Sequence, residues 1–442
     1  MTMSSPLPSL DPHTLLVFLL QVGLLLLIAL GLGRLAVRLG LPALVGELLT
    51  GVILGPSLLG TLAPGAFTWV LPADADQMHL LDAVGQLGVL LLVGVTGVQL
   101  DAAMLRRRGA TGVKVSLGGL LLPLGLGIGA GFLVPAALLT ETTDRPTFAL
   151  FLGVAMCVTA IPVIAKTLSD MGLLHRDIGQ LTLGAGMVDD AVGWFLLSVV
   201  SAAATTGVRA GAVTFSLVSL IGFLIAAFVV GRPLVRWAMR RAGRAADGGP
   251  RITTAVVIIL LGAAATHAMG MEALFGAFVA GILIGQARQE EEPGRSLWSD
   301  LTPLRTVVLS VLAPIFLATA GLRMDLTALA DPKVLLAAIA LLAIAVAGKF
   351  VGAYIGARAS RLSHWEGIAL GAGMNARGVV EVVVATTGLR LGVLSVATYT
   401  VIVLIAVVTS VMGPPILRRA MARVQQSEAE AERERVLAGV AS

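Results

Sequence analysis

The fold is decided by a stretch that occurs twice, as VGELLTGVILGP at residues 45–56 and as FGAFVAGILIGQ at residues 275–286. The three glycines of each copy occupy matching positions. The next helices show a weaker match, in which residues 97–101 resemble residues 321–325. The two copies lie seven apolar spans apart, an odd number, so they cross a membrane in opposite directions. This pattern indicates an inverted-topology repeat, which is the architecture of many secondary transporters.

The composition indicates a chain that lies mostly in lipid. Of the 442 residues, 57% are hydrophobic and 13% are charged, and the mean hydropathy is +0.94. A soluble chain of this length needs far more surface charge. The 52 glycines suit membrane helices, where they permit close packing. The single cysteine, Cys157, excludes an intrachain disulfide.

Thirteen apolar runs are close to the ~20 residues that cross the hydrocarbon core of a bilayer. We therefore predict an all-α polytopic membrane protein with 13 transmembrane helices, of which the shortest could lie obliquely. The repeats are expected at about 42–204 and 272–416, within a transmembrane domain of residues 1–416, and a short tail, expected to be cytoplasmic, follows at 417–442. The predicted spans are 14–33, 42–60, 83–100, 114–138, 147–169, 178–204, 212–235, 252–270, 272–286, 304–321, 334–357, 365–388 and 392–416.

The basic residues predict the orientation of the chain. Loops after odd-numbered spans hold 24 of the 31 Lys and Arg residues, and loops on the opposite side hold 5. Because short cytoplasmic loops are enriched in Lys and Arg, the N-terminus is expected outside the cell membrane and the C-terminus in the cytoplasm. The same bias explains the pI near 10 without nucleic-acid binding.

Two of the predicted spans carry a helix-breaking signal near their middle. Span 147–169 contains TAIP at residues 159–162, where Pro162 lacks a backbone donor. Span 365–388 contains GAGMNARG at residues 371–378. The two breaks occupy corresponding positions in the two repeats. In inverted-repeat transporters such interrupted helices build the ion site near the membrane midplane.

Two adjacent carboxylates, Asp189 and Asp190, lie in the apolar segment GAGMVDDAVGW at residues 184–194. Ionisable side chains within a membrane cost ~2.5–3.5 kcal/mol each on insertion scales, so they require a function. Neighbours on a helix point about 100° apart, which lets one carboxylate face a cavity while the other pairs with a cation. A buried carboxylate holds a proton or a small cation, and that competition produces exchange. Capping of a broken helix is the weaker reading, because apolar sequence continues on both sides.

Other ionisable residues support this site or serve the structure. Lys349 lies within span 334–357 and either forms an ion pair with Asp189 or snorkels to the membrane surface. Arg377 and Glu381 are four residues apart, share a helix face and are expected to satisfy each other and the broken backbone. Glu47 is alone in its span, where packing or gating is as plausible as contact with the ion.

At these residues the chain resembles the monovalent cation:proton antiporter-2 family, which includes plant CHX-type exchangers and the membrane part of bacterial Kef-type potassium efflux systems. The similarity extends over residues 15–416 and is carried by residues 45–56, the Asp189–Asp190 pair, FGAFVAG at 275–281 and the CHX-like GMNARGVVE at 373–381. The chain departs from Kef-type proteins in having Asp189 and in its short tail.

The resemblance implies a homodimer that exchanges protons for Na⁺ or K⁺ by alternating access. It implies that Asp190 binds the monovalent cation and the proton, and that Asp189 pairs with Lys349. Thr159 would lie in the crossed, unwound helices and contribute to the ion site, and Asn375 and Pro162 are expected to support the site. Two aspartates at this position imply electrogenic exchange.

Three alternatives stay open at this point: a channel-like potassium efflux protein, a transporter of organic anions and a membrane enzyme. The acidic pair disfavours anions, which prefer helix N-termini and basic groups. The sequence contains neither G-x-x-x-x-G-K-[ST] nor H-E-x-x-H, and no nucleophile is paired with a base. We therefore expect no enzyme activity, cofactor, nucleotide or nucleic acid. The choice between Na⁺ and K⁺ is left open.

Overall fold

The computed structural model describes residues 11–71, 75–98, 102–141, 143–173, 175–206, 210–244, 249–288, 297–428 and 430–431. These residues form helices, turns and loops and contain no strand. The chain divides into two compact units. The first comprises residues 1–89 and 307–325, and the second comprises residues 90–306 and 326–442. Two predicted features lie partly outside the described residues. These are residues 99–101, which belong to the weaker match with residues 321–325, and residues 432–442 of the predicted tail.

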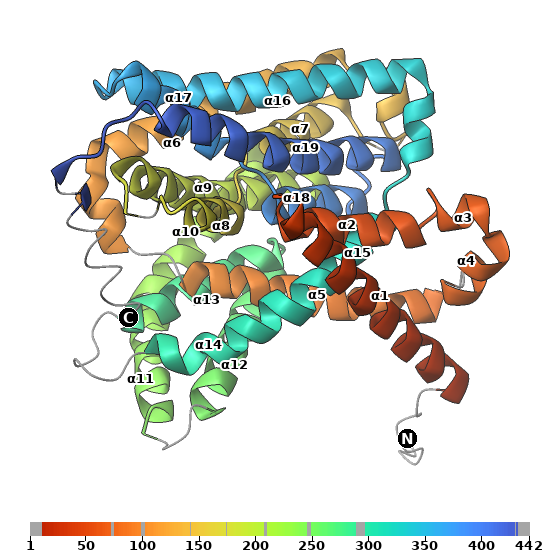
Figure 1. Cartoon of the computed structure of the whole chain (residues 1–442). Helices are drawn as coiled ribbons and strands as arrows, with labels where there is room; N and C mark the ends of the chain where they lie inside the picture. The colour runs from red at the N-terminus through yellow and green to blue at the C-terminus, as the bar shows by residue number, and fades with distance from the viewer. Residues whose placement is uncertain are drawn as a thin grey trace. The chain divides into compact units, whose positions relative to one another are not determined.

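The first unit contains the first copy of the repeated motif, on α2, which packs against both α1 and α15 (Figure 1). Its glycines explain the close packing. A methyl group at Gly51 would overlap the backbone of Ala318 and Leu322, and one at Gly46 would overlap the backbone of Leu32. The helices that lie wholly in this unit are α1 (Pro12–Arg38), α2 (Ala43–Leu54), α3 (Leu59–Leu62), α4 (Pro64–Val70) and α15 (Ala313–Leu322), with the π-helical turn η3 (Val308–Leu312). The helix α5 (Ala75–Val98) begins in this unit.

The second unit is built around α6 (Ala102–Leu133) and α16 (Pro332–Ala359), which lie side by side (Figure 1). Gly118 and Gly352 face each other, and a methyl group on either would clash with the carbonyl oxygen of the other. Such contacts between small residues bring membrane helices into direct backbone contact. The acidic pair, Asp189 and Asp190, lies on α9 (Asp177–Thr206), which packs against α6.

Both predicted helix breaks are present in the second unit. The first separates α7 (Arg145–Cys157) from α8 (Ile161–Asp170), and the second separates α17 (His364–Met374) from α18 (Val379–Arg390) with a bend of 44°. The two breaks meet, since the backbone N–H of Ala160 donates to the carbonyl oxygen of Ala376 at 3.4 Å. Pro162 is the second residue of α8, a position where the missing N–H costs little.

The remaining elements lie in the second unit, except that the last residue of α14 belongs to the first unit. Their bounds are η1 (Ala136–Leu138), α10 (Ala210–Ala226), the π-helical turn η2 (Ala227–Gly231), α11 (Arg232–Ala242), α12 (Gly249–Ala268), α13 (Ala273–Arg288), α14 (Leu297–Val307), η4 (Leu326–Ala330) and α19 (Val396–Met421). The second copy of the repeated motif forms most of α13.

The described part of the tail returns to the helices of the second unit. Glu430 forms an ion pair with Arg176 at 3.3 Å and accepts a hydrogen bond from the backbone N–H of Asp177, the first residue of α9, at 2.6 Å. The guanidinium of Arg423 lies 4.1 Å from the ring centre of Trp365, in the first turn of α17. The tail therefore contacts the starts of both α9 and α17.

The predicted all-α fold is confirmed, whereas the count of thirteen spans is not. Within the described residues, ten helices are long and apolar enough to cross a membrane, and the bent pair α17–α18 makes an eleventh. The predicted spans 147–169 and 272–286 correspond to shorter helices, α7 with α8 and α13. For span 147–169 the physical reason is that the interruption leaves two half-helices, each of which covers only part of a bilayer, whereas α13 is one continuous helix of 16 residues.

Candidate ion site

Asp189 lies in the middle of α9 and is saturated with partners. Its Oδ1 accepts a hydrogen bond from Ser116 Oγ of α6 at 2.5 Å, and its Oδ2 accepts one from Thr159 Oγ1 of the first break at 2.7 Å. Lys349 Nζ of α16 pairs with Oδ2 at 2.5 Å. All four side chains are buried. Hydrogen bonds to an ionised group are roughly twice as strong as neutral ones, so these contacts fix the orientation of Asp189.

Lys349 is wholly buried, which rules out snorkelling to the membrane surface in this structure. Besides Asp189, its Nζ donates to the carbonyl oxygen of Cys157 at 2.5 Å. Cys157 is the last residue of α7, where carbonyls lack helical partners and carry partial negative charge. The ammonium group therefore joins α16, the end of α7 and the middle of α9.

Asp190 has the opposite surroundings. It is 0% exposed, and neither carboxylate oxygen has a hydrogen-bond partner among the described residues. The cause is its position, because adjacent residues on a helix point about 100° apart and Asp190 cannot share the partners of Asp189. A buried carboxylate without partners is strongly unfavourable. A proton or a cation at these oxygens would relieve that cost.

Arg377 fills the region where the two breaks meet. Its buried guanidinium donates to the carbonyl oxygens of Ala155 at 3.3 Å, Met156 at 2.6 Å and Ala345 at 3.0 Å, and pairs with Glu381. Carbonyl groups in the last turn of α7 have no helical donors, so the side chain replaces the bonds that the interruption removes. Arg377, which belongs to the second break, thus satisfies backbone carbonyl groups beside the first break.

The pair of Arg377 with Glu381 forms as expected, but one detail of the prediction is wrong. Arg377 lies before α18 rather than on its face, because the helix begins only after Gly378, whose backbone is extended. Asn375 is the C-terminal cap of α17 and is buried, and its Oδ1 has no hydrogen-bond partner among the described residues. Glu381 lies in the first turn of α18, where a negative charge is favoured.

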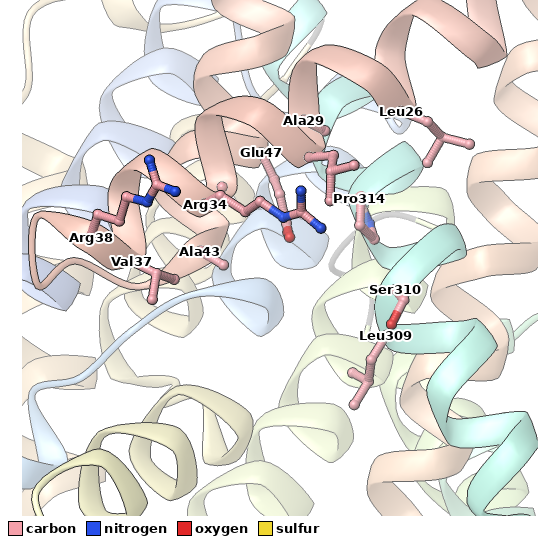
Figure 2. Close-up of a pocket in the computed structure, with 12 residues that line it drawn as sticks. Leu26, Ala29, Arg34, Val37, Arg38, Ala43, Glu47, Leu309, Ser310 and Pro314 are labelled. Atoms are coloured by element: carbon pink, nitrogen blue, oxygen red, sulfur yellow. The ribbon is translucent and has the colours of Figure 1, made fainter.

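The structure brings most of the predicted site residues together in the second unit. These are Thr159, Asp189, Asp190, Lys349, Asn375, Arg377 and Glu381. Pro162 is placed by the backbone of α8, while its side chain lies outside the described residues. Glu47 belongs to the first unit. It lines a cavity of about 480 Å³ between α1, α2 and the segment 309–314, into which Arg34 also extends (Figure 2).

Sequence reasoning missed two contributors to the site. Ser116 is a lone hydroxyl in a glycine-rich run, and its only signal was a polar residue within an apolar span. The carbonyl oxygen of Cys157 accepts from Lys349, and a backbone acceptor leaves no signal in the residue type. Within the described residues, no group of three or more His, Cys, Asp or Glu side chains is arranged to hold a metal ion.

Two interrupted helices that meet beside a buried acidic pair and a buried lysine define a class of protein, the membrane cation/proton antiporters. The transmembrane sodium/hydrogen exchanger family matches residues 23–423. The chain belongs to this family.

Individual relatives agree with this assignment. The chain is 32% identical over 411 residues to the Na⁺/H⁺ antiporter NhaS4 of Synechocystis sp., which covers 92% of this chain and 98% of that protein. It is 29% identical over 424 residues to cation/H⁺ antiporter 18 of Arabidopsis thaliana, covering 94% of this chain and 50% of that protein. The fold is similar to the solved structure of the sodium proton antiporter MjNhaP1 from Methanocaldococcus jannaschii, with a TM-score of 0.67 at 16% sequence identity. The match covers 93% of this chain and 99% of that chain.

The resemblance to monovalent cation:proton antiporters is therefore confirmed. These relatives support proton-coupled cation exchange and give no support to the channel-like alternative. The chain is a multi-span membrane protein of a transporter family.

Proposed function

We propose that the chain exchanges protons for Na⁺ or K⁺ across the cell membrane by alternating access, with Asp190 as the binding group for both. One observation carries this proposal. Asp190 is fully buried, and neither of its carboxylate oxygens accepts a hydrogen bond of normal geometry from the described residues, although the backbone N–H of Ile161 at the start of α8 lies beside it. Its neighbour Asp189 is fully engaged by Ser116, Thr159 and Lys349.

The contrast between the two carboxylates supplies the exchange chemistry. A proton on Asp190 removes the charge that attracts a cation, and a bound cation favours the deprotonated carboxylate. Each ligand therefore displaces the other from the same oxygens. Loading from one side and release to the other converts this competition into coupled transport in opposite directions.

Lys349 adds a second step to the proposal. Its ammonium group is held by Asp189 and by the carbonyl oxygen of Cys157. When a cation enters beside Asp190, this added positive charge weakens the pairing of Lys349, and the pair opens. Release of a proton from Lys349 as well as from Asp190 would move more protons than cations, which makes the exchange electrogenic.

The orientation and assembly are also part of the proposal. The 24 basic residues on one side support a cytoplasmic C-terminal tail and an N-terminus outside the cell. We propose a homodimer, as the family resemblance implies. Because NhaS4 is named as a Na⁺/H⁺ antiporter, Na⁺ is the first cation to test, followed by K⁺.

The test uses purified protein in liposomes with an inside-acid pH gradient, to which Na⁺, K⁺ or choline is added outside. We expect Na⁺ or K⁺, but not choline, to collapse the gradient in the wild type. Asp190→Asn should reduce the cation-dependent flux to the level of empty liposomes. Asp331→Asn is the matched control, since Asp331 only caps the start of α16.

Unchanged flux in Asp190→Asn would overturn the assignment of the site. A wild type that is correctly inserted yet exchanges neither cation at any pH would overturn the function.

A further inference from the structure

We infer that one face of α9, formed by Trp194, Ser198 and Ser201, lines a hydrated route along which the proton and the cation travel between Asp190 and the C-terminal end of that helix. The inference rests on the proposed function, because the route ends at Asp190. It assigns a transport role to three residues that take no part in the ion pairs of the site, of which Trp194 is the last residue of the segment that contains the acidic pair.

The first observation is a set of buried polar atoms without partners. Trp194 and Ser198 are each 2% exposed and Ser201 is 6% exposed. Trp194 Nε1, Ser198 Oγ and Ser201 Oγ have no hydrogen-bond partner among the described residues. A helical serine or threonine normally donates to a carbonyl three or four residues earlier. Thr182 does so in the same helix, donating to Ile178 at 2.7 Å, but the two serines do not.

The second observation is the spacing of these residues. Positions 190, 194, 198 and 201 are separated by four, four and three residues. At 3.6 residues per turn they fall within about 80° of the helix circumference and extend over about 16 Å. They form one continuous polar stripe from the unpartnered carboxylate of Asp190 toward the end of α9 at Thr206.

The energetics favour water along this stripe. A buried polar group without a partner costs about 1–3 kcal/mol, and three of them follow one another here. A hydrocarbon environment offers no compensation, whereas a water molecule that bridges several polar groups does. Polar side chains within membrane segments also mark substrate and ion pathways.

An aromatic contact narrows the route beside Asp190. Trp194 lies one turn from Asp190, and its ring centre is 6.2 Å from that of Phe278 on α13. This bulky pair separates the carboxylate from the two serines. A route closed at one point in this way suits an alternating carrier, in which the ion site is never open to both sides, and not a continuous pore.

A competing explanation is that the two serines serve only as small residues for close helix packing. Chemical accessibility separates the two explanations. In a Cys157→Ala background, which keeps the carbonyl group that Lys349 contacts, Ser198→Cys and Ser201→Cys are treated with a small, water-soluble, cationic methanethiosulfonate. The reagent is added on the side where α9 ends. Leu197→Cys is the matched control, because Leu197 lies at the same depth and is 0% exposed.

We expect both cysteines of the stripe to react much faster than the Leu197→Cys control. Equal, slow reaction at all three positions would overturn the inference. This measurement does not depend on transport, so it decides the inference even where the proposed function fails.

The second part of the test measures transport in liposomes. The Ser198→Ala/Ser201→Ala double variant should lower the maximal exchange rate several-fold with little change in the apparent affinity for the cation. Thr182→Val, eight residues from Asp190 on the other side, serves as the control and should keep the wild-type rate. Exchange by the wild type together with an unchanged rate in the double variant would contradict the route while leaving Asp190 as the binding site.

Discussion

The two helix breaks differ in where their charge comes from. The first break, residues 158–160, contains no charged side chain, and the carbonyl groups at the end of α7 bond to cations from elsewhere: Lys349 at Cys157 and Arg377 at Met156. The second break, residues 375–378, carries Arg377 itself.

This difference leaves one carboxylate without a counter-ion where the two breaks meet. Around the two breaks the buried groups include three carboxylates, Asp189, Asp190 and Glu381, and two cations, Lys349 and Arg377. Each cation is paired with one carboxylate, so Asp190 is left over. One carboxylate in excess matches one proton or one monovalent cation.

The largest effect is expected at Arg377. Arg377→Gln removes three hydrogen bonds to carbonyl oxygens and leaves Glu381 buried without its cation, so we expect a loss of about 3–5 kcal/mol in stability. Thermal unfolding in detergent measures this loss. Arg390→Gln, at the end of α18, is the control, because the ion pair of the partly exposed Arg390 with Glu272 is worth at most about 1 kcal/mol. Equal shifts in the two variants would contradict the role of Arg377.

The second prediction compares the neighbouring carboxylates. Asp189→Asn leaves Lys349 buried without its counter-ion, so we expect the protein to lose about 3 kcal/mol of stability. Asp190→Asn removes a charge that has no protein partner and should leave the unfolding temperature unchanged or higher. The unfolding temperatures of the two variants and the wild type are measured at neutral pH without Na⁺ or K⁺. A larger loss in Asp190→Asn would mean that the carboxylate has a structural partner.

The third prediction concerns the neutral side chain of the first break. Thr159→Val keeps the shape of Thr159 but removes its hydrogen bond to Asp189, which should cost about 1.5–3 kcal/mol because the acceptor is charged. Thr159→Ser keeps the hydroxyl group and should retain most of the stability. The unfolding temperatures of the three proteins provide the measurement. Identical unfolding temperatures for Thr159→Val and Thr159→Ser would show that the hydroxyl group does not contribute to stability.

The smallest effect is expected in the tail, which touches a helix next to each break. Glu430→Gln should cost about 1 kcal/mol, because the amide oxygen of glutamine can still accept the hydrogen bond from the N–H of Asp177 and only the charge that pairs with Arg176 is lost. Hydrogen exchange in the first turn of α9 should then become faster, while the exposed control Glu428→Gln should leave it unchanged. No change in Glu430→Gln would show that the tail does not restrain α9.

The pH dependence of this contact has a definite sign. Burial raises the pKa of Glu430, but the N–H groups of Asp177 and Ser427 and the guanidinium of Arg176 outweigh it and lower the pKa below its usual 4.5. A carboxyl whose folded-state pKa is lowered stabilises the fold above its unfolded pKa. The stability difference between the wild type and Glu430→Gln should therefore be present above pH 4.5 and disappear as the pH falls through the lowered value.

The sequence predicted the features that stand out against an apolar background. Asp189, Asp190 and Lys349 are conspicuous because charge within a membrane span is costly, and the helix breaks are marked by Pro162 and a glycine-rich run. Contacts between distant segments were not predictable in the same way. Nothing in the residue type of Ser116 indicates a partner 73 positions away, and helix lengths at the breaks depend on tertiary packing.

The contact of α6 with α16 through Gly118 and Gly352 has a consequence for how the protein can change over evolutionary time. One methyl group at either position would push the helices apart and separate Ser116 and Lys349 from Asp189, although neither glycine touches the ion site. Substitution of these glycines should therefore be as rare in natural variation as substitution of the aspartates. The geometry of the ion site therefore depends in part on two residues that have no side chain.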